Sequence, residues 1–90
     1  MKSITDINQL MNNVQSAIMA LNAMNSTVQS VMITGSKPVI RIARNGHCLR
    51  MIEQGKASYN YIGHRGTGLF RQGTFPLHGC RVIWSESLIN

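Results

Sequence analysis

The sequence predicts an α+β fold, with one N-terminal amphipathic helix packed on an antiparallel sheet of about four to six strands. Three observations lead to this prediction. The chain has 90 residues, the length of a single domain, which we place over residues 1–90. Apolar residues recur with the helical period over residues 3–25. From residue 27 to residue 84, short segments rich in β-type residues alternate with turn residues, and residues 85–90 are expected to fray.

The helix predicted over residues 3–25 begins with Ser3 followed three residues later by Asp6, which resembles a capping box. Its opposite face is polar but almost uncharged, so the helix needs to bury its apolar stripe. We expect the stripe to pack on the sheet. The alternative is that part of it docks on a second copy of the chain or on a partner. The stripe consists of Ile4, Ile7, Leu10, Met11, Val14, Ile18, Leu21 and Met24.

Strands are predicted where β-branched and aromatic residues lie between turn residues. Asn45-Gly46 is the strongest turn signal, because a two-residue type I′ hairpin needs positive φ at both central positions. It predicts a tight hairpin between the second and third strands. The predicted strands are residues 27–34, 39–44, 47–53, 57–64, 69–75 and 80–84.

This hairpin would set a register in which Arg41 lies opposite Arg50. Because side chains alternate between the faces of a strand, the two arginines would share one face and point away from the core. Like charges placed side by side are destabilising, so the pair would either spread into water or receive an anion. In this register Ile40, Ile42, Leu49 and Met51 would form the core face, and Arg41, Ala43, Cys48 and Arg50 the other face.

The formal net charge is +6, and the charge is unevenly distributed. Residues 1–34 carry only Lys2 and Asp6, whereas residues 35–90 are strongly cationic. Such a surface suits nucleic acid or an acidic protein surface, and the plainer alternative is that the charge only confers solubility. We therefore predict a partner-binding site on the open face of the sheet and its flanking turns. Its predicted residues are Arg41, Arg44 and Arg50 at the centre and Arg65 and Arg71 at the rim.

Enzyme activity is not expected. A chain this short leaves little room for a deep catalytic cavity, and three acidic residues offer no acid–base pair for its three histidines. We expect no metal and no cofactor, because no spacing typical of zinc ligands is present. Cys48 and Cys80 are expected to be reduced. Gly63–Gly68 lacks the GK[ST] ending of a phosphate-binding loop and leads into a predicted strand, so it is interpreted as a hairpin loop.

Three stretches carry a resemblance to a known family: MKSITDI at residues 1–7, ALNAMNSTV at residues 20–28 and LHGCRVIW at residues 77–84. With these stretches the chain resembles, over nearly its whole length, the epsilon derepression proteins of satellite coliphages. The resemblance implies an antirepressor in the host cell cytoplasm. It would bind the immunity repressor of a helper prophage by protein–protein contact and prevent operator binding, so that the helper's lytic genes are expressed. It implies no catalytic residue.

The alternative function is a small basic regulator that binds nucleic acid directly, using the face predicted to carry Arg41 and Arg50. A homodimer is a further expected partner arrangement. We expect no membrane association, because no apolar run approaches the length of a membrane-spanning helix and the first residues contain no apolar segment typical of a signal peptide.

Overall fold

The computed structural model describes residues 4–66 and 68–88 and confirms the predicted α+β fold. Ser3, the predicted helix cap, and residues 89–90 of the predicted frayed tail lie outside the described residues. The elements in chain order are helix α1 (Ile4–Ala23), strands β1 (Val28–Met32) and β2 (Val39–Ile42), helix α2 (Gly46–Glu53), and strands β3 (Ser58–Arg65), β4 (Gly68–Leu77) and β5 (Cys80–Ser87).

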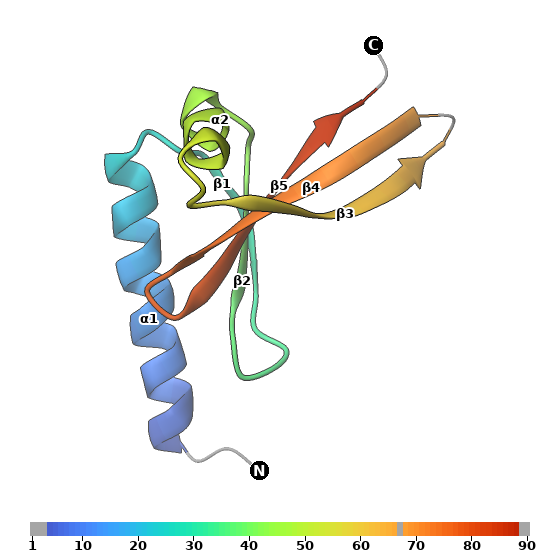
Figure 1. Ribbon diagram of the computed structural model, residues 1–90. Helices are drawn as coiled ribbons and strands as arrows, with labels where there is room; N and C mark the ends of the chain where they lie inside the picture. The colour runs from blue at the N-terminus through green and yellow to red at the C-terminus, as the bar shows by residue number, and fades with distance from the viewer. Residues whose placement is uncertain (1–3, 67, 89–90) are drawn as a thin grey trace.

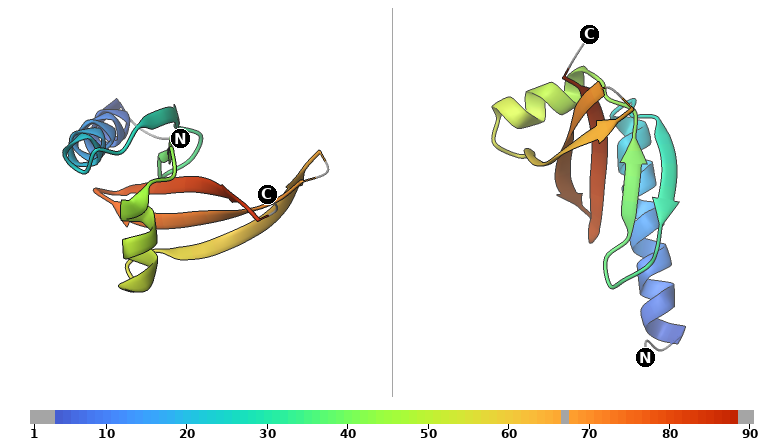
Figure 2. Two further views of the ribbon diagram at one scale, coloured as in Figure 1. Left: turned by 90° about the horizontal axis from the view of Figure 1, so that it is seen from above. Right: turned by 90° about the vertical axis from the view of Figure 1, so that its right-hand side faces the viewer.

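The described strands form one sheet in the order β1-β2-β5-β4-β3, and both helices lie on the same side of it (Figures 1 and 2). Strands β3, β4 and β5 form two consecutive hairpins, as the sequence predicts. The sheet is not purely antiparallel, however, because β2 pairs in parallel with β5. A helix connects β2 to β3 where a hairpin was predicted. β2 therefore has no antiparallel neighbour on that side, and β5 takes the place beside it.

The core lies between the sheet and the two helices. Trp84 and Val82 of β5 and Ile40 of β2 are fully buried there, beneath Ala17 and Leu21 of α1. The α1 stripe packs as predicted from Val14 onward, and Leu10 is also buried. Ile7 and Met11, in contrast, remain exposed.

The segment predicted as the third strand, residues 47–53, is helix α2, and the Asn45-Gly46 hairpin is wrong. Asn45 has extended backbone, with φ −147° and ψ 178°, and its side-chain oxygen accepts a 3.1 Å hydrogen bond from the Cys48 backbone N–H. Asn45 is therefore the N-cap of α2, a position at which asparagine is as favourable as in a turn. Gly46 is the first helical residue and is not among the described residues with positive φ.

The register derived from that hairpin is wrong for the same reason. Arg50 lies on α2 and does not pair with Arg41 on β2. Leu49, which was assigned to the core, is exposed, whereas Cys48, which was assigned to the outer face, is buried against the core. The period of a helix, rather than that of a strand, sets which of these side chains is covered.

A two-residue turn with positive φ at both positions does occur, at His78–Gly79 between β4 and β5. Its φ angles are 48° and 77°. Leu77 and Cys80 are the residues that pair on either side of it. The prediction that the tail frays from residue 85 is wrong for residues 85–87. Residues 85–87 do not fray but continue β5 to Ser87, and the Leu88 backbone N–H donates a 2.9 Å hydrogen bond to the Leu69 carbonyl.

Candidate functional site

Three of the predicted arginines meet at one groove of about 410 Å³, which we call the arginine groove. Arg41 comes from β2, Arg44 from the segment that follows β2, and Arg65 from the end of β3. No carboxylate is among the side chains that line it. Its full lining consists of Gln29, Arg41, Ile42, Ala43, Arg44, Arg65 and Ser85.

Arg41 is held in place by the pairing of β2 with β5. It alternates with Ile40 and Ile42, whose side chains are buried beneath the helices, so Arg41 points to the open face of the sheet. There its Nη1 donates a 2.9 Å hydrogen bond to Oγ of Ser85 on β5. The Arg41 guanidinium is thus held by a neutral hydroxyl, and this contact does not compensate the positive charge of Arg41.

Arg65 approaches the groove from the β3–β4 hairpin. Its guanidinium carbon lies 5.0 Å from the centre of the Phe70 ring, a distance typical of a cation–π contact. The Phe70 ring in turn lies 5.9 Å from that of Tyr61. Neither Arg65 nor Arg41 forms an ion pair with a carboxylate within residues 4–66 and 68–88.

Arg44 connects the groove to a buried carboxylate. Its Nε lies 3.4 Å from Oε2 of Glu86, whose side chain is only 8% exposed. Arg44 itself is about half exposed, so one side of its guanidinium meets Glu86 while the other faces solvent. Arg44 therefore keeps a defined position at the edge of the groove and can still contact a partner there.

Glu86 is the centre of a polar cluster on the helix side of the sheet. Its Oε2 accepts hydrogen bonds from the Trp84 indole N–H at 3.0 Å and the Tyr59 hydroxyl at 2.9 Å. Its Oε1 accepts one from Arg71 Nε at 3.1 Å. Burial raises the pKa of the Glu86 carboxyl, but these hydrogen bonds and the Arg71 charge outweigh burial, and the net pKa lies below the ordinary value. The charged form is therefore the one that the fold stabilises.

The other two predicted arginines lie outside the groove. Arg71 forms its ion pair with Glu86 at 3.1 Å, and its guanidinium carbon lies 3.7 Å from the centre of the Tyr59 ring. Its connection to the groove runs through Glu86, which also contacts Arg44. Arg50 is exposed on α2, where its Nη1 lies over Gly46, 3.6 Å from the position a Cβ would take there. The structure thus brings Arg41, Arg44 and Arg65 together and leaves Arg50 and Arg71 apart.

Glu86 and Ser85 were missed because the last strand was predicted to end at Trp84. A signal for Glu86 was present in the sequence. It stands two residues after Trp84, and residues two apart on a strand share a face. Extending the strand by two residues would have placed the Glu86 carboxylate beside the buried indole, where it requires donors, and Ser85 on the open face with Arg41.

The arrangement can receive an anion. Three guanidinium groups from separate elements surround a groove lined mainly by polar atoms, and guanidinium groups bind carboxylates and phosphates through paired hydrogen bonds. In the part of the chain that the structure describes, no three His, Cys, Asp or Glu side chains gather as metal ligands. Cys48 and Cys80 are unbridged and buried, and burial raises the pKa of both thiols.

No helix among the described residues is both long enough and apolar enough to cross a membrane. A family model described as "Uncharacterised protein" matches residues 1–87, so the chain belongs to that family. No curated protein and no solved structure matches the chain.

Proposed function

We propose that this family member is an antirepressor that binds the immunity repressor of a helper prophage by protein–protein contact and prevents operator binding. The arginine groove is its contact site, with an acidic side chain of the repressor as the group received. Two observations support this proposal. The sequence resembles epsilon derepression proteins in three stretches, and the groove offers a cationic binding site without any group suited to bond making or breaking.

The observation that carries the proposal is the uncompensated charge of Arg41 and Arg65 in the groove. Arginines whose charge is balanced within the fold, such as Arg71 with Glu86, have little to gain from an acidic partner. Arg41 is oriented by Ser85 and Arg65 by Phe70, so both lose little conformational freedom when a carboxylate arrives. Arginine anchors of this kind are frequent among the residues that dominate binding energy.

The sign of the charge also indicates which repressor surface is bound. A DNA-reading surface is positively charged because it contacts phosphates, and it would repel a protein of net charge +6. The antirepressor therefore contacts an acidic surface elsewhere on the repressor. It would then prevent operator binding by holding the repressor in an arrangement that cannot engage both half-sites, and not by imitating DNA.

Direct binding of single-stranded nucleic acid is the second candidate, since Arg65, Phe70 and Tyr61 lie together on the open face. Stacking of bases needs free aromatic rings, however. Trp84 and Phe75 are buried in the core, Tyr59 lies beneath Arg71, and Phe70 is in contact with Arg65. Within residues 4–66 and 68–88, Tyr61 alone offers a largely free ring, with 54% exposure, and this favours a protein partner.

Size-exclusion chromatography separates the two candidates. The purified chain is mixed with the purified repressor, and in parallel with operator DNA and with a single-stranded oligonucleotide. The proposal predicts a co-eluting protein complex and release of the repressor from its operator. A steep, salt-sensitive affinity for nucleic acid alone, with no repressor complex, would establish the second candidate instead.

A further inference from the structure

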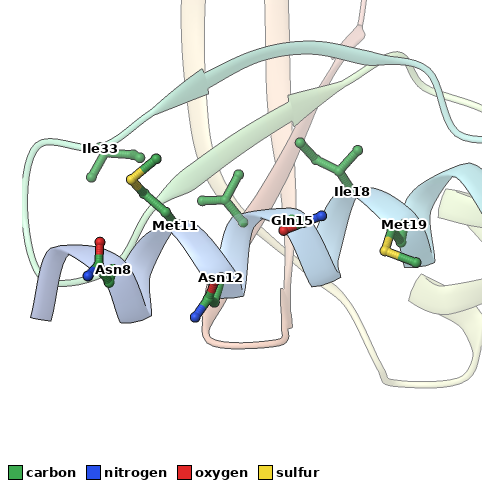
Figure 3. Close-up of a pocket in the computed structure, with 8 residues that line it drawn as sticks. Asn8, Met11, Asn12, Gln15, Ile18, Met19 and Ile33 are labelled. Carbon is green, nitrogen blue, oxygen red and sulfur yellow. The ribbon is translucent and has the colours of Figure 1, made fainter. Parts of the chain in front are cut away.

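An uncovered apolar surface lies along helix α1 and the neighbouring strand β1. Its centre is an open groove of about 750 Å³ between α1 and Ile33, which follows β1. Met11 points toward Ile33 across this groove (Figure 3), and its side chain is 58% exposed. We call this the α1–β1 surface, and its exposed apolar side chains are Ile7, Met11, Met19, Val31 and Ile33.

Strand β1 adds an unpaired edge to this surface. It is the first strand in the sheet order, and within the described residues it pairs with β2 alone. Its sequence, VQSVM, contains no charge and no proline, the features that usually protect an edge from pairing with another chain. A bulge between Val28 and Ser30 interrupts the pairing with β2, but Ser30–Met32 remains regular and exposed. By contrast β3, the opposite edge, ends in His64 and Arg65.

The distribution of charge identifies what can cover the surface. Residues 7–36 contain no charged residue, although the chain as a whole carries +6. An acidic partner gains nothing from such a surface and is attracted to the arginines instead. Two copies of the chain repel each other wherever their cationic parts approach, so the uncharged α1–β1 surface is the part through which they can meet.

We propose that the chain forms a two-fold symmetric homodimer through the α1–β1 surface, with β1 of each copy paired antiparallel along its free edge. A two-fold axis brings the same patch of both copies together, so the protruding methionines of one copy can enter the groove between α1 and Ile33 of the other. Methionine suits this role because its flexible thioether adapts to irregular gaps.

The homodimer is tested on the purified chain alone, without any repressor, so that its failure is separate from that of the proposed function. Analytical ultracentrifugation of the full chain at micromolar concentrations should give twice the monomer mass. The double variant Met11→Lys with Ile33→Lys places a charge on each side of the groove, and it should weaken dimerisation about 30-fold or more. Ile62→Lys is the matched control, because Ile62 is 66% exposed on β3 at the far edge of the sheet.

Circular dichroism checks that each variant remains folded. Amide hydrogen exchange measures whether the free edge of β1 is paired. The proposal predicts that the β1 amides become protected as the wild-type concentration rises, and that the double variant loses this protection. A wild-type chain that sediments as a monomer throughout would overturn the proposal. So would a folded double variant that remains dimeric.

Discussion

The indole Nε1 of Trp84 donates a 3.0 Å hydrogen bond to Oε2 of Glu86, two residues further along the same strand. Trp84 is fully buried and Glu86 nearly so. The same carboxylate contacts Arg44, at the edge of the arginine groove, and Arg71. One buried acidic group thus joins the core to the candidate binding site.

Replacing Glu86 with glutamine should lower the free energy of unfolding by about 2–3 kcal/mol. The change removes a buried charge partner of two arginines and turns one acceptor oxygen into a donor facing other donors. The arginines are partly exposed, which keeps the loss below that of a fully buried pair. Urea denaturation gives the value, and Glu53→Gln on the exposed end of α2 is the control. Equal stability of Glu86→Gln and wild type would refute the role given to this cluster.

The Glu86 cluster should also make stability depend on acid pH. Because its pKa is lower in the folded chain than its ordinary value of 4.5, the carboxylate stabilises the fold fully above that value. This contribution is lost as the pH falls through the folded-state pKa. The difference in unfolding free energy between wild type and Glu86→Gln should therefore shrink in acid. A difference that stays constant down to the pH at which the wild type unfolds would contradict the assignment.

Gly73 should not tolerate a side chain. A Cβ at this position of β4 would collide with ring atoms of Trp84, whose side chain is fully buried. We expect Gly73→Ala to cost about 1–3 kcal/mol, the range for an overfilled core. Gly35→Ala is the matched control, since nothing lies within 4 Å of its Cβ position. Thermal melts of the two variants should differ clearly, and identical melting temperatures would show that Trp84 is not packed as described.

Asn45 and Gly46 should respond to substitution as a helix start and not as a hairpin turn. Asn45→Ala removes the cap of the Cys48 N–H and should cost about 1 kcal/mol. Gly46→Ala should be neutral or stabilising, since alanine favours a helix and restricts the unfolded chain. If Gly46→Ala instead lowers the free energy of unfolding by about 1 kcal/mol or more in urea denaturation, Gly46 has positive φ and the helix start is contradicted.

The same two residues show how far the sequence alone could predict the fold. The stripe of α1 and the alternating segments of β4 and β5 were sufficient for the fold class, because burial strongly selects their periods. Asn45-Gly46 was ambiguous, since asparagine followed by glycine suits both a type I′ turn and a helix start. In this chain the Asn45 side chain caps the Cys48 N–H, and the Cys48 side chain is buried. Both interactions favour the helix.

The candidate site was predicted in part, for a related reason. Arg41 was correctly placed on the open face because strand alternation does not depend on the partner strand. Arg50 was misplaced together with the false hairpin. The meeting of Arg41 with Arg65 and Ser85 depends on the parallel pairing of β2 with β5, a contact between segments far apart in the sequence that no local pattern encodes.

The central claim, that the arginine groove binds the repressor, is tested most directly by calorimetric titration of the repressor with two double variants. Both variants remove two positive charges. Arg41→Ala with Arg65→Ala empties the groove, and Arg50→Ala with Arg81→Ala removes exposed arginines outside it. The account predicts that the groove variant binds about 30-fold more weakly, equivalent to about 2 kcal/mol, while the control stays close to wild type. A groove variant within twofold of wild-type affinity, or equal losses in both variants, would contradict the account.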